Sequence, residues 1–326
     1  MLKKILVALV VLWAPVVQAQ TQAQTQAQTS PWPVKPVRII VPLSPGGSVD
    51  MIARLFAGRL SEALGQPFVV DNRAGASSTL GAAIAVRANA DGNTLLMMSP
   101  AFTGSAALHK LPYDPIKDIA PIVMLAEGGM FLATHPSVKA SGVKEFIDLT
   151  RAAPGVYKYG SGGVGSGTHL ATELLRQMAK VDVVHVPYKG IGAAIVDLLG
   201  GQIQFYIAPG GALTPHASVG KLRLLATTAE KRTPELPEMP AMAEVVPGYS
   251  AVFWYGLGAP ANTPRAVINK LNEECTRILK QADVQKRLLL DDVRPAQGTP
   301  EDFARRIRSD IAMWSRVVQI ANIRIE

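Results

Sequence analysis

The chain has 326 residues, which is enough for two or three domains with substantial hydrophobic cores. Hydrophobic residues make up 48% and charged residues 18%, so an intrinsically disordered chain is excluded. Aromatic residues are only 6% and the basic residues are scattered, so we expect no nucleic-acid partner despite the net charge of +8.

The first residues have the pattern of a secretory signal. Lys3 and Lys4 precede residues 5–17, an uncharged and mostly apolar run, and Val17 and Ala19 are small residues at the two positions that a signal peptidase reads. Thirteen residues are too few to span a bilayer, so we predict a signal peptide over 1–19 rather than a membrane anchor, with no stable membrane insertion. The short apolar run is typical of bacteria, so we expect the periplasm. Cleavage after Ala19 removes two lysines and leaves +6.

Residues 20–34 begin with repeats of Gln, Thr and Ala that carry no charge, and they predict a disordered tether. The only cysteine, Cys275, lies at helical spacing among apolar residues, where a buried thiol is expected. One cysteine excludes an intrachain disulfide, a CxxC motif and, by its position, a lipoprotein anchor.

Strands and helices alternate from residue 37. Residues 37–41 form a β-branched run, and apolar residues then recur at helical spacing from Ile52 until Gly65 ends the pattern. Further strands are expected at 68–70, 94–98, 157–159, 181–186, 203–207 and 222–228. Repeated βαβ alternation predicts an α/β fold in which mainly parallel sheets are flanked by helices.

The last part of the chain is organised differently. Residues 251–257 predict a strand, and helices follow, with Thr263 and Thr299 as N-caps that each precede a proline. Two apolar stretches, 122–133 and 249–259, run between otherwise complete α/β units. They indicate a discontinuous first domain, residues 35–130 plus 252–326, and a second domain of residues 131–251.

Three loops rich in Gly, Ser and Thr precede predicted helices: the first loop (44–50), the second loop (72–79) and the third loop (160–169). Glycine lets the backbone approach a ligand, and the free amides of a helix start favour an anion. In open α/β sheets such loops lie at the carboxyl ends of strands, where ligands bind. A single loop of this kind is more often a simple turn, but three together favour an anion site.

Other chemistries fit the sequence less well. The third loop contains G-x-G-x-x-G, but the next strand ends at Val186 without the acidic residue that a dinucleotide site needs. Ser166 and His169, with Asp182, leave a serine hydrolase open, although the local sequence is not the G-x-S-x-G elbow. The histidines do not cluster, so we expect no metal, no cofactor and no catalytic residue. Tyr188, beyond a strand end, suits a ligand contact.

The loops together resemble a known family. Residues 41–50 (VPLSPGGSVD) are similar to the opening loop of Bug-type solute-binding proteins, the receptors of tripartite tricarboxylate transporters. Residues 71–75 (DNRAG) resemble the second loop of these proteins. Segments 111–118, 159–170, 185–190 and 198–202 are similarly placed, so the resemblance extends in order over nearly all of the chain after Pro33.

This resemblance implies a periplasmic two-domain receptor of the type II binding-protein fold, with a small carboxylate in the interdomain cleft. A membrane permease is the implied partner, and we expect the receptor to be a monomer. One carboxylate would be held by the first and third loops, at Ser44, Pro45, Gly46, Gly47, Asp50, Ser161, Gly165, Ser166 and Thr168. The other end of the ligand would be shaped by Ser77, Ser78, Thr79 and Thr103.

Two departures from the family pattern concern specificity. The second loop has Ser77 and Ser78 where glycines are usual. The strand at 204–207 ends in Ala208 and Pro209, where the family often has an acidic residue that could pair with an ammonium group. We therefore expect a di- or tricarboxylate or an aromatic carboxylate without an amine. A sensory binding protein that reports to a membrane signalling partner would bind in the same way and stays open.

Overall fold

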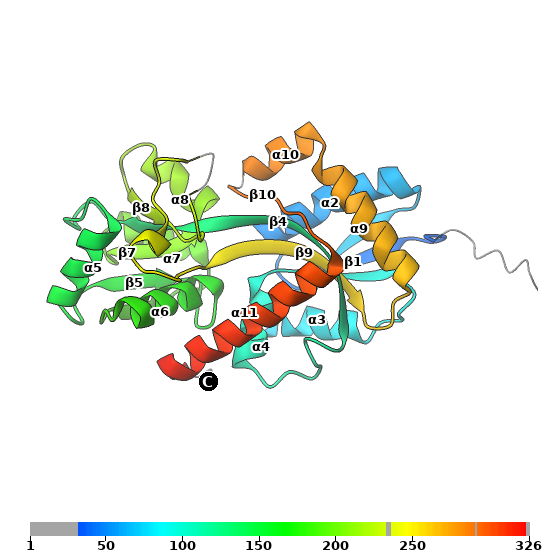
Figure 1. Ribbon diagram of the computed structural model, residues 1–326, viewed down its shortest axis with the longest axis horizontal. Helices are drawn as coiled ribbons and strands as arrows, with labels where there is room; N and C mark the ends of the chain where they lie inside the picture. Colours follow the sequence, from blue (N-terminus) through cyan, green and yellow to red (C-terminus); the bar gives the residue numbers. More distant parts are fainter. Residues whose placement is uncertain (1–31, 233–235, 291, 324–326) are drawn as a thin grey trace, which may run out of the picture. The chain divides into compact units, whose positions relative to one another are not determined.

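The computed structural model describes residues 32–232, 236–290 and 292–323 (Figure 1). The predicted signal peptide and most of the predicted tether lie outside these ranges. Residues from Lys35 onward belong to one unit of contacts.

The first lobe is a parallel sheet with helices on its faces. It contains β1 (Val37–Val41), β2 (Phe68–Asn72), β3 (Thr94–Met98), α2 (Ser48–Leu64), α3 (Thr79–Val86) and α4 (Pro100–Leu108). Strand β1 pairs in parallel with β2 and with β3, as the alternation predicts. Ile52, Phe56 and Leu60 line the buried face of α2, and Gly65 ends this helix with a φ of 68°.

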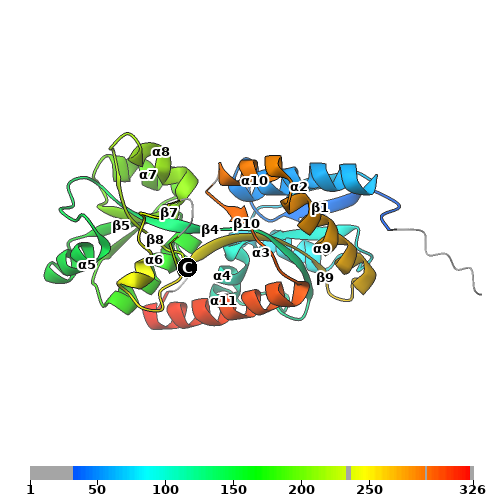
Figure 2. The ribbon, with the colours of Figure 1, turned by 45° about the horizontal axis from the view of Figure 1, so that its top comes forward.

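Two long strands connect this lobe to the rest of the chain. Strand β4 (Ile119–Thr134) and strand β9 (Val252–Pro260) pair antiparallel, from Ile119 opposite Pro260 to Gly129 opposite Val252. Strand β4 contains the stretch 122–133 and β9 contains most of the stretch 249–259 that the sequence indicated as crossings, and both views show the two strands side by side (Figures 1 and 2). The strand order is β2-β1-β3-β9-β4-β7-β5-β6, so the carboxyl ends of the parallel strands of each lobe point toward the other lobe.

The second lobe repeats the βα alternation. Its elements are α5 (Val143–Ala152), β5 (Lys158–Ser161), α6 (Gly167–Ala179), β6 (Val184–Pro187), α7 (Ile191–Leu199), β7 (Phe205–Pro209), α8 (Gly210–Ala217) and β8 (Arg223–Thr227). Strand β5 pairs in parallel with β6 and β7, but β8 pairs antiparallel with β4, which the alternation did not predict.

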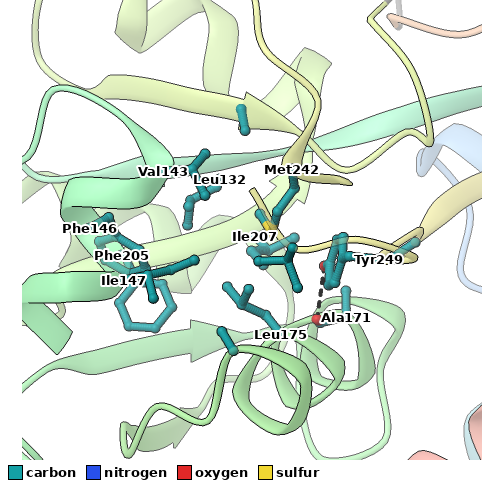
Figure 3. Close-up of a cluster of buried hydrophobic side chains, with 14 of the residues drawn as sticks. Leu132, Val143, Phe146, Ile147, Ala171, Leu175, Phe205, Ile207, Met242 and Tyr249 are labelled. Carbon is teal, nitrogen blue, oxygen red and sulfur yellow. Dashed lines mark hydrogen bonds between the residues drawn. The ribbon is translucent and has the colours of Figure 1, made fainter. Parts of the chain in front are cut away.

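Alternate residues of the central strands of this lobe supply two cores. Leu132, Phe205 and Ile207 point to the core beneath α5 and α6, where Tyr249 donates to the carbonyl of Ala171 over 2.9 Å (Figure 3). The residues between them, such as Tyr206, enter the core beneath α7 and α8. Because successive side chains of a strand point to opposite faces, both faces of this sheet are buried.

The chain ends in α9 (Arg265–Leu279), α10 (Ala282–Leu289), the short strand β10 (Arg294–Pro295) and α11 (Pro300–Ala321). Thr299 caps α11 through the amide of Asp302, as predicted. The prediction for Thr263 was wrong, because its hydroxyl donates to the carbonyl of Pro260 and Pro264 occupies the N-cap position of α9.

Helix α11 packs on both lobes. Phe303 and Ile307 belong to the core of the first lobe, whereas Trp314 and Val317 belong to the core beneath α5 and α6. The carbonyl of Val317 also accepts from Gln177 of α6 over 2.9 Å. The predicted domain division at residues 130/131 and 251/252 stays a prediction. The end of α11, which that division assigns to the first domain, packs against the second lobe.

Candidate functional site

The first loop leads from β1 directly into α2. Its residues Ser44 to Gly47 are exposed, and Gly46 has a φ of +85°, a left-handed conformation that favours glycine. Gly47 is the N-cap of α2 and has no side chain that could accept from the first helical turn. The amides of that turn have no acceptor within the helix, so they form a ready site for an anion.

Asp50 stabilises the first loop from its buried side. Its side chain is only 4% exposed, and its carboxylate accepts from the Gly46 amide (3.0 Å), Arg54 Nε (3.0 Å) and Asn72 Nδ2 (2.9 Å). Burial raises the pKa of Asp50, but these hydrogen bonds and the charge of Arg54 outweigh burial and lower it. The carboxylate is therefore ionised, and it accepts hydrogen bonds from the Gly46 amide, Arg54 and Asn72 of the protein itself.

The second loop has an unusual backbone. Ala76, Ser77 and Ser78 have φ values of 45°, 51° and 76°, so three successive non-glycine residues are left-handed. Ser78 is the N-cap of α3, and its buried hydroxyl has no hydrogen-bond partner among the described residues; the same is true of Thr79 Oγ1. Side-chain hydroxyls thus lie at the start of α3 without capping it.

Helix α4 contacts both the second loop and the third loop. Ser105 Oγ donates to the carbonyl of Ser77, and an ideal Cβ at Gly104 would lie 3.3 Å from Leu170 and 3.5 Å from the carbonyl of Gly165. Thr103, on the same helix, is buried and donates to the carbonyl of Pro100. The small residue at 104 allows the third loop of the second lobe to approach α4 of the first.

The third loop is held by its own side chains. Thr168 Oγ1 accepts from the Gly162 amide (2.9 Å) and lies 3.0 Å from Ser166 Oγ, while Ser161 Oγ accepts from the Gly163 amide (3.1 Å). His169 Nδ1 accepts from the Gly165 amide over 3.0 Å. These acceptors occupy amides in the body of the loop. In the first turn of α6 the Ser166 hydroxyl accepts from the His169 amide, whereas the amides of Gly167 and Thr168 have no acceptor within the helix.

The hydroxyl groups of this loop do not form a catalytic triad. Ser166 Oγ accepts from the His169 amide, and the imidazole of His169 faces Gly165 instead of Ser166. A different pair, Ser161 Oγ and His185 Nε2, is 2.6 Å apart, but Ser161 is completely buried. A substrate carbonyl cannot reach Ser161 in this conformation.

Two predicted contact residues point elsewhere. Tyr188 lies beside the third loop through its backbone, but its hydroxyl donates to Asp197 Oδ2 of α7 over 2.6 Å, which together with burial raises its pKa to about 12. Ala208 is fully buried in the core beneath α7 and α8. Asn72, Gly104, Ser105 and His185 contact the candidate loops in the structure and were not among the predicted contact residues.

A comparison of the sequence with family models identifies the family. The model described as tripartite tricarboxylate transporter family receptor matches residues 52–323. The chain belongs to this family. Its members are periplasmic solute-binding receptors and not enzymes, so the resemblance predicted from the loops is confirmed.

Relatives and solved structures agree with this assignment. Protein BugT of Bordetella pertussis is 34% identical over 292 residues, which are 88% of this chain and 90% of BugT. The structure of R. palustris Rpa4515 with adipate has 35% identity and a TM-score of 0.79, covering 90% of this chain and 99% of that one. MatC (Rpa3494) from Rhodopseudomonas palustris with bound malate has 31% identity and a TM-score of 0.75, covering 88% and 100%. The predicted binding-protein fold is confirmed.

None of the helices in the described ranges is both long and apolar enough to cross a membrane. Within the same ranges, no three side chains of His, Cys, Asp or Glu are grouped in a way that could hold a metal ion. Cys275, predicted to be buried, is a buried free thiol, and burial raises its pKa.

Proposed function

We propose that the protein is exported to the periplasm and captures a small carboxylate that has no amine. The ligand is gripped between the first-turn amides of α2 in the first lobe and those of α6 in the second. Binding favours a closed arrangement of the lobes, which is presented to the permease of a tripartite transporter. The ligand leaves chemically unchanged.

One observation carries this proposal: most polar side chains at the site hold the loops. The first turn of α2 has no side-chain cap, and in α6 the Ser166 hydroxyl caps only the His169 amide, which leaves those of Gly167 and Thr168. Asp50, Ser161, Thr168 and His169 each accept an amide of the first or third loop. Oriented amides at two helix starts act as fixed positive dipoles, so a carboxylate can be bound without an arginine or lysine in the site.

The ligand class is supported by the chemistry near the end of β7. Ala208 and Pro209 offer no carboxylate for an ammonium group. Asp292 does reach this end from the first lobe, but its Oδ2 lies 3.2 Å from Thr214 Oγ1, beside Gly210 at the start of α8. The helix dipole at that start already compensates the negative charge. Adipate and malate, the ligands bound to two relatives, are dicarboxylates without an amine.

The decisive experiment measures binding by the mature protein to matched pairs of ligands. Isothermal titration with succinate and aspartate, glutarate and glutamate, and adipate and 2-aminoadipate compares each acid with its amino counterpart. We expect a non-amino carboxylate to bind most tightly, and a thermal shift to report it, since a ligand at one hundred times Kd stabilises by about 2.7 kcal/mol. Tighter binding of an amino acid than of every other acid would contradict the ligand class.

A matched pair of leucine variants locates the site. Gly47 and Gly142 are both N-cap glycines with negative φ, and an ideal Cβ at either has no atom closer than 3.9 Å. Both Gly47→Leu and Gly142→Leu should therefore fold. We expect Gly47→Leu to abolish binding and Gly142→Leu to leave Kd unchanged. Equal binding by both variants would place the ligand elsewhere.

Two measurements test the sensory function and the hydrolase function. Uptake of the labelled ligand by cells that lack this protein, with and without its gene restored, tests delivery to a permease. Uptake that does not depend on the protein would favour the sensory function. Consumption of activated esters by the wild type, lost in Ser166→Ala, would favour the hydrolase.

A further inference from the structure

Two histidine rings lie stacked behind the third loop. His169 of α6 and His185 of β6 have ring centroids 3.9 Å apart and an interplanar angle of 12°. His185 also stacks on Tyr159 of β5, at 4.8 Å. His169 is 4% exposed, so at least this ring belongs to the interior of the second lobe. The packing explains why two imidazoles are here, but it does not explain their hydrogen bonds.

Each ring makes one hydrogen bond into the third loop, from a different nitrogen. His169 Nδ1 accepts from the Gly165 amide, so this nitrogen carries no proton and a neutral ring carries its proton on Nε2. Ser161 Oγ accepts from the Gly163 amide and donates to the Gly163 carbonyl over 3.2 Å. Its remaining capacity is as an acceptor, so His185 donates to it from a protonated Nε2 over 2.6 Å.

The surroundings keep both rings neutral. Burial lowers the pKa of His169 to about 3, and His185 and Arg176 act in the same direction. Burial also lowers the pKa of His185, although the charge of Glu173 opposes this. The carboxylate of Glu173 is itself engaged, because it accepts from Tyr159 Oη (2.7 Å) and Arg176 Nε (2.8 Å).

Two aromatic residues of β7 lie near the pair and carry no charge. Phe205 of β7 packs against Tyr159 with ring centroids 5.7 Å apart, and Tyr206, on the opposite face of the same strand, is fully buried. Among the described residues, the titratable groups that interact with the two rings are Tyr159, Glu173 and Arg176, and neither imidazole is hydrogen-bonded to a carboxylate there. A proton on His169 Nδ1 would face the Gly165 N–H, so two donors would oppose each other and the hydrogen bond would be lost.

We propose that His169 and His185 are positioning residues for the ligand. By accepting the Gly165 amide and donating to Ser161, they withdraw these two groups from the site and determine which amides of the third loop and α6 face the carboxylate. This inference rests on the proposed function, since it assigns the origin of the affinity of that same site.

Amide side chains test the two hydrogen bonds separately. The oxygen of Asn lies near the position of histidine Nδ1, whereas the amide nitrogen of Gln can reach the position of Nε2. His169→Asn therefore retains an acceptor for Gly165, and His185→Gln retains a donor for Ser161. His169→Gln and His185→Asn are the matched variants that lose them.

The probe is adipate, measured by isothermal titration, with urea unfolding of every variant. We expect His169→Asn and His185→Gln to bind within about threefold of the wild type, and the other two variants to lose roughly tenfold or more, about 1.4 kcal/mol. If the rings only fill space, the larger Gln should be better than Asn at both positions, and affinity should follow stability. That result would overturn the proposal.

Nitrogen-15 NMR of the histidine side chains gives a second readout that needs no ligand. The His169 ring should be a neutral Nε2–H tautomer from pH 8 to pH 5, and the His185 ring should be one at pH 7 and above. An Nδ1–H tautomer or a charged ring at pH 7 would refute this inference, even if adipate binds. Failure of the wild type to bind any carboxylate would instead refute the proposed function, whatever the tautomers are.

Discussion

Replacing Asp50 by Ala removes the carboxylate that holds the first loop, and the structure allows the cost to be worked out. Three hydrogen bonds are lost, but their donors do not all stay unsatisfied. Gly46 is exposed, the Arg54 side chain is 56% exposed, and Asn72 Nδ2 retains its bond to the Leu43 carbonyl. With about 1 kcal/mol net for each bond, and solvent screening of the Arg54 pair, we expect a loss of about 3 kcal/mol in the free energy of unfolding.

Asp50→Asn should cost less, because one amide oxygen still accepts. We expect about 1–2 kcal/mol at neutral pH. The pKa of Asp50 is lowered in the folded state, so its contribution is complete above the ordinary value of 3.8 and disappears as the pH falls through the folded-state pKa. The difference in stability between wild type and Asp50→Asn should therefore shrink in acid.

The loss of Asp50 should also weaken ligand binding. Without Asp50 the Gly46 amide is released and the first loop gains conformations, so we expect adipate affinity to fall at least tenfold in Asp50→Ala. The matched control is Asp310→Asn. Asp310 is equally buried and accepts from Trp254 (2.7 Å) and Arg306 (2.8 Å), but it lies in the core of the first lobe.

The assays are urea unfolding and isothermal titration with adipate. Asp310→Asn should lose stability while Kd stays within about twofold, which separates damage to the fold from damage to the site. The reasoning would be refuted if Asp50→Ala unfolded within 0.5 kcal/mol of the wild type, a difference typical of an uninvolved surface position. Equal loss of affinity in both variants would refute the specific role of the first loop.

Three further predictions concern chemistry, pH and packing. Activated esters should not be consumed faster with the wild type than with Ser161→Ala, and a rate that depends on Ser161 would contradict a receptor. Burial raises the pKa of Asp310, so the wild type should gain stability relative to Asp310→Asn as the pH falls through that pKa; a gain in the opposite direction in urea unfolding would contradict the assignment. In Gly81→Ala the new Cβ would lie 2.7 Å from Pro42 Cα and 2.8 Å from the Arg73 carbonyl, so unfolding should show a loss of about 2 kcal/mol. An unchanged stability would mean that α3 is not closely packed against Pro42 and the second loop.

The sequence predicts the frame of the site because that frame follows from periodicity. Apolar spacing locates α2, and parallel strands bring the starts of α2 and α6 to facing ends of the two lobes. These are local rules, so no knowledge of tertiary contacts is needed. The exact start of α2 was not predicted: the apolar spacing begins at Ile52, whereas the helix begins at Ser48 with Gly47 as its N-cap.

The use of each polar side chain is less predictable because it depends on distant residues. Ser161 was expected to contact the ligand, but its hydroxyl is taken by Gly163 and by His185, which is 24 positions away. One signal could have found His185: it is opposite Tyr159 in the parallel pairing of β5 with β6, on the same face of the sheet. Tyr188 was predicted to contact the ligand, whereas its hydroxyl donates to Asp197 on the next helix.

The charge near the end of β7 also depends on a residue that is distant in the sequence, and it leads to a last prediction. The local sequence, Ala208 and Pro209, has no acidic residue, yet Asp292 lies beside Gly210, on the loop that follows α10. If Asp292 were the counter-charge for an ammonium group, aspartate would bind well and Asp292→Asn would weaken its binding relative to malate. We expect the ratio of the two affinities to be unchanged in Asp292→Asn, because Thr214 and the start of α8 already stabilise this carboxylate. Titration of both ligands decides between these outcomes, and a selective loss of aspartate binding would assign Asp292 to the ligand site.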